Sequence, residues 1–135
     1  MTKQVNKMGF GSLRVNKVND DMAEVFVYGD IGGWGDGIGA DEFARELKAL
    51  KVTDITARIN SGGGSVFEGQ AIYNSLVNHP AKVNVVIDGI AASIASVIAM
   101  AGDTISITEG SHIMVHKPWS MAMGDANSMR KEAEV

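Results

Sequence analysis

Short β-like stretches alternate along the chain with stretches of helical periodicity. Residues 12–18 alternate polar and apolar side chains, and residues 23–28 (AEVFVY) are rich in β-branched and aromatic side chains, so both predict strands. Asn19-Asp20-Asp21 lies between them as a turn signal. The same reasoning predicts further strands at residues 54–60, 82–87, 104–108 and 112–116.

Four other stretches predict helices. Residues 41–50 place Phe43, Leu47 and Leu50 at helical spacing, with acidic residues in the first turn. A second helix is expected at residues 66–77, with these side chains available for its buried face: Phe67, Ile72, Leu76 and Val77. The remaining two are residues 91–101, rich in Ala, Ile and Val, and the segment from Gly124 onward, with Asp125 as its cap.

The order of these elements predicts the fold class. Strand, helix, strand, helix, strand, helix is the pattern of right-handed βαβ units around a largely parallel sheet, hence an α/β protein. Residues 90–100 are apolar nearly all round, which is typical of a helix buried between layers or between subunits. With 135 residues, we expect one domain spanning residues 1–135, in which residues 1–22 form an N-terminal segment with one strand.

Composition then excludes several classes of function. Hydrophobic residues make up 45% and charged residues 21%, which is ordinary globular usage and argues against wholesale disorder. The net charge is −4 with no basic block, so nucleic-acid binding by charge is not expected. The absence of cysteine excludes disulfides, thiol nucleophiles and cysteine zinc sites.

Targeting signals are not evident either. Residues 1–7 are polar and no apolar segment follows them, so no secretory signal is predicted. The longest uncharged apolar run, residues 90–102, is shorter than the roughly 20 residues of a membrane span. The expectation is a soluble, cytoplasmic protein without a membrane partner.

Candidate chemistry lies where three predicted strands end. Sites in open α/β sheets form at the carboxyl ends of parallel strands. One strand runs into the glycine loop Gly62-Gly63-Gly64, a second into Ser93, and a third into His116. A glycine loop, a serine and a histidine are therefore expected at one edge of the sheet.

These residue types suit acyl transfer. Ser93 would lie at a strand-to-helix turn among small alanines, which let a substrate carbonyl approach its hydroxyl. His116 could accept the serine proton, because the ordinary histidine pKa lies near neutrality. The glycine loop could direct backbone N–H groups at a developing oxyanion.

Other interpretations of these residues remain open at this point. Ser93 could simply be packed, and Ser96, one turn later, is a competing nucleophile that helix packing would shield. His112 and His116 lie four apart on one predicted strand and could be structural or half of a metal site, whereas His79 before Pro80 fits a surface position. Gly35-x-Gly37-x-x-Ala40 fits a relaxed dinucleotide fingerprint, but it begins several residues after its strand ends.

Three ordered motifs resemble the proteolytic subunits of Clp protease. Asn60-Ser61-Gly62-Gly63-Gly64 followed by Gly69 is similar to the family's Asn-Ser-Pro-Gly-Gly…Gly segment, with Gly62 in place of proline. Asp88-Gly89-Ile90-Ala91-Ala92-Ser93 resembles the segment with the family's nucleophile, and Met114-Val115-His116-Lys117-Pro118 the segment with its base. The order and spacing agree over roughly residues 23–135.

The resemblance implies roles for single residues. Ser93 matches the nucleophile, His116 the general base, and Gly64 and Ile94 the positions whose N–H groups form the oxyanion hole. The positions at which the family pairs an extended peptide substrate are these: Gly63, Ser65 and Val66. No cofactor and no metal are implied.

The resemblance also implies a fold, partners and a branch of the family. The fold would be crotonase-like α/β, in subunits that form homo-oligomeric rings around their active sites and cleave protein or peptide substrates. Three segments are similar to the proteases of tailed phages and prophages that cleave scaffold or capsid protein during head maturation: Asp30-Ile31-Gly32-Gly33-Trp34, Val66-Phe67-Glu68-Gly69-Gln70-Ala71-Ile72-Tyr73-Asn74 and His116-Lys117-Pro118-Trp119.

One part of the family pattern has no counterpart in the sequence. The triad aspartate and the helical handle of the family lie beyond the position of residue 135, so the chain is expected to be C-terminally truncated. Two alternatives follow from the same fold: a non-catalytic crotonase-like assembly subunit, and an acyl-CoA-binding relative that uses the glycine loops.

Overall fold

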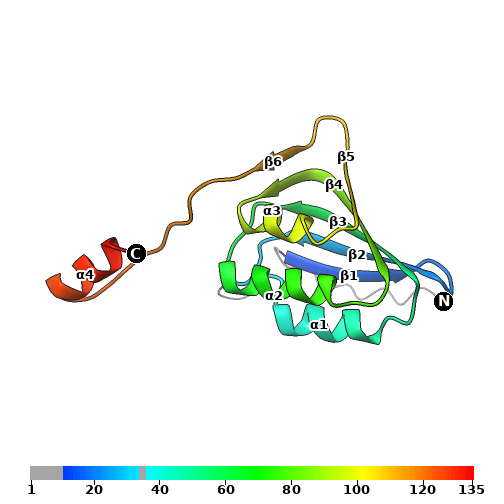
Figure 1. Cartoon of the computed structure of the whole chain (residues 1–135), viewed down its shortest axis with the longest axis horizontal. Helices are drawn as coiled ribbons and strands as arrows, with labels where there is room; N and C mark the ends of the chain where they lie inside the picture. The colour runs from blue at the N-terminus through cyan, green and yellow to red at the C-terminus, as the bar shows by residue number, and fades with distance from the viewer. Residues whose placement is uncertain (1–10, 34–35) are drawn as a thin grey trace.

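The computed structural model of the protein describes residues 11–33 and 36–135 (Figure 1). The first ten residues of the expected N-terminal segment, together with Trp34 and Gly35, lie outside the described residues, as do the side chains of residues 11–13. The strands are β1 (Gly11–Lys17), β2 (Met22–Gly29), β3 (Asp54–Ser61), β4 (Lys82–Ala92), β5 (Thr104–Ile107) and β6 (His112–Met114). The helices are α1 (Ala40–Ala49), α2 (Val66–Val77), α3 (Ile94–Ala99) and α4 (Ala126–Ala133).

The strands form one mostly parallel sheet, as the sequence predicts. Its order is β1-β2-β3-β4-β5, and β6 also pairs with β4, beyond the end of β5. Only β1, which pairs with β2 through a short turn, is antiparallel to its neighbour among the described strands. The carboxyl ends of β2, β3, β4 and β6 consequently reach the same edge of the sheet.

One face of the sheet is covered by helices and contains the core. Alternate residues of β2, β3 and β4 are buried against this layer, in agreement with the period of two along a strand. Phe43 and Leu47 of α1 and Ile72 and Leu76 of α2 pack onto them. Helix α3 adds Ile94, Ala95, Ile98 and Ala99 to the same core.

Two boundaries differ from the sequence prediction. The expected helix over residues 91–101 begins only at Ile94, because residues 90–92 continue β4 and pair with β6 on one side, while Ala91 also pairs with Ser61 of β3. The strand expected at residues 112–116 ends at Met114, so His112 and His116 do not share one strand face.

The expected buried face of α2 is also partly wrong. Ile72 and Leu76 are buried, but Phe67 is 88% exposed and Val77 is half exposed. The third buried residue of α2 is Gly69, which faces Ile94 of α3. Hydrophobicity alone did not identify this contact, because the helices meet at a residue without a side chain.

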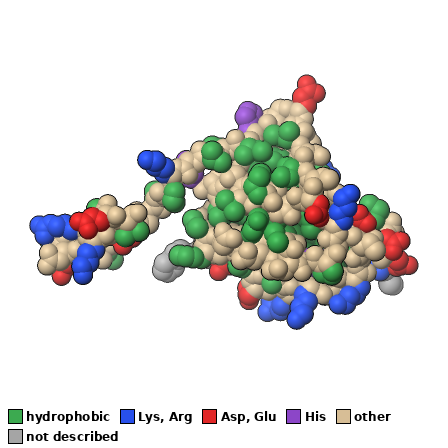
Figure 2. Space-filling model, viewed as in Figure 1, with side chains coloured by type: hydrophobic (Ala, Val, Ile, Leu, Met, Phe, Trp, Pro, Cys, Tyr) green, Lys and Arg blue, Asp and Glu red, His purple; other side chains and the backbone are tan. Residues whose placement is uncertain are grey.

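The region after β6 extends away from the sheet (Figure 1). Its last helix, α4, is capped as predicted, since the Asp125 carboxylate accepts the Ser128 N–H at 2.8 Å. Hydrophobic side chains gather on the face shown in Figure 2 around α3 and the edge strands, where these residues are exposed: Val97, Met100, Ile105, Ile107 and Ile113. Among the described helices, none is long and apolar enough to cross a membrane.

The contact between α2 and α3 gives a first prediction. A Cβ on Gly69 would overlap Ile94 Cγ1, so Gly69→Ala must displace a buried side chain. We expect the overpacking to exceed the gain of about 1 kcal/mol in helix propensity and to lower the free energy of unfolding by about 1–2 kcal/mol in urea. Gly62→Ala is the matched control, because nothing lies within 4 Å of that Cβ. Equal midpoints for both variants would contradict this account.

Candidate active site

Ser93 lies in the tight turn between β4 and α3. Its backbone angles are φ 55° and ψ −128°, and it is the one non-glycine residue with positive φ among those that the structure describes. Such a conformation costs about 1–3 kcal/mol in a residue with a side chain, and it is typical of serines held out of a strand-to-helix turn. The predicted turn position of Ser93 is therefore confirmed.

His116 reaches this serine from β6. Its Nε2 lies 2.7 Å from Ser93 Oγ, and in the tautomer protonated at Nδ1 it accepts the serine O–H. Pairing of β6 with residues 90–92 positions the histidine, and the Ser93 N–H donates to the Met114 carbonyl at 2.8 Å. Side chains 23 positions apart in the chain are thus brought into hydrogen-bond contact.

The glycine loop after β3 lies directly against this turn. A Cβ on Gly63 would come within 2.8 Å of both the Ala92 carbonyl and Ser93 Cβ, so only glycine fits. Gly63 and Gly64 also have φ of 97° and 148°, in the range that favours glycine. The loop can approach Ser93 because Gly63 has no side chain where the two backbones meet.

Ile31 fixes the direction of the loop. Its N–H donates to the Gly63 carbonyl at 2.9 Å, and its own carbonyl accepts the Ser65 N–H at 2.8 Å. Because successive peptide groups of an extended chain point to opposite sides, the N–H and C=O of Gly64 are directed away from Ile31. A carbonyl or a peptide strand can therefore pair with Gly64.

The other predicted residues surround the same point. Ile94 is the first residue of α3 and is buried against Gly69, while Ser65 caps α2 by accepting the Glu68 N–H. Val66 begins α2 and is 47% exposed, and the exposed Gly62 contacts nothing at its Cβ position.

Two of the alternative residues have structural contacts of their own. Ser96 is buried, and its hydroxyl donates to the Ser93 carbonyl at 2.6 Å, so it supports the turn and has no open path to a substrate. His79 follows α2, where its Nδ1 accepts the Ala81 N–H at 3.1 Å.

Sequence reasoning missed Ser61 as a supporting residue. Its buried hydroxyl donates to the Gly29 carbonyl at 2.6 Å and accepts the Gly63 N–H at 3.1 Å, so it ties the end of β2 to the glycine loop. A polar residue at the last position of an otherwise apolar strand face was the available signal.

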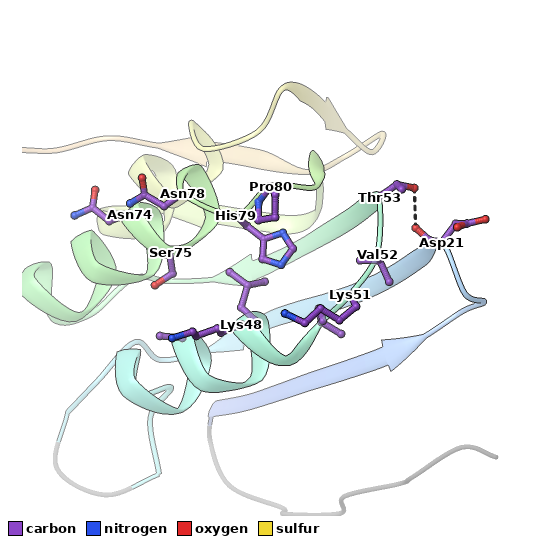
Figure 3. A pocket seen from close by; sticks show the side chains of 13 residues that line it. Asp21, Lys48, Lys51, Val52, Thr53, Asn74, Ser75, Asn78, His79 and Pro80 are labelled. Atoms are coloured by element: carbon purple, nitrogen blue, oxygen red, sulfur yellow. Dashed lines mark hydrogen bonds between the residues drawn. The ribbon is translucent and has the colours of Figure 1, made fainter.

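Sequence reasoning also missed a groove at the opposite end of the strands (Figure 3). It has a volume of about 740 Å³ and lies where α1 and α2 end and β2 to β4 begin. Lys48 and Lys51 line one side, and Asn74, Ser75 and Asn78 of α2 line the other. Ser93 is not among the residues that line this groove.

A cluster of charged and aromatic side chains lies on the sheet face opposite the helices. Arg58 donates to Asp88 through Nε at 2.8 Å and Nη2 at 2.5 Å, and the Tyr28 hydroxyl donates to the same carboxylate at 2.6 Å. Glu24 lies 3.7 Å from the same guanidinium, and Arg14 stacks 5.1 Å from the Phe26 ring centre. The side chains of this cluster come from β1, β2, β3 and β4, and Asp88 of β4 shortly precedes the turn at Ser93.

This environment shifts three pKa values. The hydrogen bonds to Asp88 raise the pKa of Arg58. Burial by itself raises the pKa of Asp88, but the hydrogen bonds from Arg58 and Tyr28 and the charge of Arg58 outweigh burial and hold that pKa below its usual range. Burial raises the pKa of Tyr28, and its bond to Asp88 raises it further. At neutral pH the cluster therefore holds an ionised carboxylate and a protonated phenol.

The arrangement around Ser93 is suited to acyl transfer. A hydroxyl in contact with an imidazole can be activated for attack on a carbonyl. Backbone N–H groups near that hydroxyl can stabilise the oxyanion that forms.

Comparison with known proteins relates this geometry to a family. Residues 20–135 match the Clp protease family. The chain is 41% identical over 88 residues to the ATP-dependent Clp protease proteolytic subunit of Ligilactobacillus salivarius, and 38% identical over 78 residues to that of Bacteroides fragilis. These alignments cover 60% and 56% of the chain, and 42% and 38% of the relatives.

A solved structure shows the same fold. A point mutant of ClpP1 from Listeria monocytogenes matches with a TM-score of 0.65 and 28% sequence identity, over 82% of this chain and 61% of that one. The α/β fold with a mostly parallel sheet is thereby established. The chain spans about two fifths of the length of the curated relatives that it matches.

The lowered pKa of Asp88 predicts a pH-dependent stability. An aspartate in the unfolded chain titrates near pH 3.9, so the stabilisation by native Asp88 is present above about pH 4 and is lost as the pH falls through the lowered native value. Urea unfolding should show Asp88→Asn to be less stable than wild type by about 1–3 kcal/mol at pH 6, with a smaller difference at pH 3 that decreases further as the pH falls. An equal difference at both pH values would contradict the assignment.

Proposed function

Because the chain belongs to the Clp protease family, we propose that it is a serine peptidase with Ser93 as nucleophile and His116 as general base. The observation that carries this proposal is the 2.7 Å contact between Ser93 Oγ and His116 Nε2. It is formed by a serine in a strained turn, beside a loop in which only glycine fits at position 63.

The reaction follows from these positions. Ser93 Oγ attacks the carbonyl of a peptide bond while His116 Nε2 takes the hydroxyl proton. The N–H groups of Gly64 and Ile94 bind the oxyanion of the tetrahedral intermediate. His116 then gives the proton to the leaving amine, and water hydrolyses the acyl-enzyme with His116 again acting as base.

The substrate segment would lie along the glycine loop. The outward-directed peptide group of Gly64 supports pairing with an extended peptide, as in strand addition at a sheet edge. Gly63 and Ser65 frame this pairing position, and the exposed Val66 side chain lies next to it. The proposed substrate class is therefore an unfolded or extended polypeptide.

The orientation of His116 bears on the rate. Within residues 11–33 and 36–135, no side chain is hydrogen-bonded to His116 Nδ1. A carboxylate at that nitrogen holds the active tautomer in Ser-His-Asp enzymes, and its removal costs about 10⁴ in rate. The proposal accordingly places the third member of the triad outside these residues.

The biological setting is a further part of the proposal. We place the chain in the phage branch of the family, acting in a homo-oligomeric ring on scaffold or capsid protein during head maturation. The support is the similarity of the segments around Gly32, Gly69 and His116 to that branch. A ring would also bring neighbouring subunits to the exposed apolar residues of β5 and β6.

Covalent labelling tests the nucleophile directly. Incubation with a fluorophosphonate should add one label, seen by intact-mass spectrometry and lost in Ser93→Ala. His116→Gln should slow labelling by about 10²-fold or more, because the serine then loses its base.

Matched controls come from the same chain. Ser75→Ala on α2 and His79→Gln after α2 change the same residue types away from the 2.7 Å contact, and both should label at the wild-type rate. Folded wild-type protein that takes up no label would contradict a hydrolase in this chain and favour a non-catalytic subunit.

A further inference from the structure

The register between β3 and β4 shifts shortly before Ser93. Ile87 pairs with Ile59, but the next pair is Ala91 with Ser61, so β4 advances four residues while β3 advances two. The additional residues form a bulge at Asp88, Gly89 and Ile90. Bulges bend a strand and redirect the chain that follows.

The bulge also separates the two edge partners of β4. Residues 84–87 pair with β5, whereas residues 90–92 pair with β6. The segment after the bulge ends at Ser93, and β6 leads to His116. The distance between the side chains of Ser93 and His116 therefore depends on the path of β4 through the bulge.

Side chains of two neighbouring strands, β2 and β3, hold the bulge. Asp88 receives both hydrogen bonds of the Arg58 fork and one from Tyr28. The Asn60 amide oxygen accepts the Ile90 N–H at 3.3 Å and occupies the space where a Cβ on Gly89 would lie, 2.6 Å away.

The backbone at the bulge has a further partner on the side of β4 that faces β5. The Thr108 hydroxyl donates to the carbonyls of Ile87 at 3.1 Å and Asp88 at 3.3 Å. The bulge is thus fastened to β2 and β3 by side chains and to the segment after β5 by a threonine.

The Asp88 contact is strong by comparison with the surface ion pairs. The side chains of Asp88 and Arg58 are 15% and 31% exposed, and their fork geometry is bidentate. The pair Arg45–Asp41, in contrast, is 3.8 Å long with both side chains more than 70% exposed. Tyr28 is itself held in place by an edge-to-face contact with Phe26, at 5.6 Å between ring centres.

From these observations we infer that Asp88, held by Arg58 and Tyr28, is a positioning residue that sets the Ser93–His116 contact through the β4 bulge. The inference rests on the proposed function of Ser93 and His116. None of the three side chains touches the reacting atoms, so they act on the reaction only through the backbone of residues 88–92.

The test compares four variants at a temperature at which circular dichroism shows all of them folded. Tyr28→Phe removes one hydroxyl and is the mildest change, Asp88→Asn breaks the fork, and Arg58→Met removes its donor. Asp103→Asn is the control, because Asp103 accepts the Val83 N–H at 2.7 Å at the other end of β4. A loss of strand stability alone would affect this control as well.

Two readouts are measured on each variant. The first is the rate of fluorophosphonate labelling of Ser93. We expect Asp88→Asn and Arg58→Met to slow it by about 10- to 100-fold, as for a displaced catalytic pair, and Tyr28→Phe by less. The double variant of Asp88 and Arg58 should be no slower than the slower single one, because the two act as a unit. Asp103→Asn should keep the wild-type rate.

The second readout is the nuclear magnetic resonance signal of the His116 ring, assigned by its loss in His116→Gln. It should shift in the Asp88, Arg58 and Tyr28 variants and stay in place in Asp103→Asn. Wild-type labelling rates in the three cluster variants, or an unmoved His116 signal, would overturn the inference. Wild-type protein that takes up no label contradicts the proposed function instead, and the His116 signal then still decides whether the cluster positions the histidine.

Discussion

The close approach of two backbones, at Gly63 and at Ser93, is the constraint on which the rest of the site depends. A Cβ at Gly63 would collide with both the Ala92 carbonyl and Ser93 Cβ, so the loop after β3 can reach the turn after β4 only as glycine. The same requirement recurs nearby, where Gly64 lies against Ile31 and Gly69 against Ile94. The glycines therefore serve mainly to let strands and helices meet, and exposed backbone N–H groups are the consequence.

Much of this organisation could be predicted from the sequence, because strong periodicity and ordered motifs reflect it. The βαβ order, the bounds of α2, the Asp125 cap and the meeting of Ser93 with His116 all follow from local patterns. The path of residues 88–92 does not. Ala91 and Ala92 fit a helix as well as a strand, and pairing with β3 and β6 decides for the strand. Exposed Phe67 was misplaced for a related reason, since the helix contact is made at Gly69.

The polar cluster escaped prediction because its members are far apart in sequence. Tyr28, Arg58 and Asp88 lie on three neighbouring parallel strands, and only the register brings them together. Arg58 pairs with Phe26 and Val86, each two residues before Tyr28 or Asp88 on its strand. Each alone looks like a residue on the solvent face of a strand. Together they exchange three hydrogen bonds on one carboxylate, at the point where β4 changes its partner.

The two members of the proposed catalytic pair are fixed to different degrees. Ser93 is joined to the core on both sides, by buried Ala92 and Ile94, and its carbonyl receives the Ser96 hydroxyl. His116 follows a strand of three residues that is exposed and pairs only with β4 among the described strands. The serine is thus held by core packing, whereas the histidine depends on a short ladder that begins at the bulge. Any change in that ladder acts first on the position of the base, which makes the β4–β6 pairing the weaker support of the site.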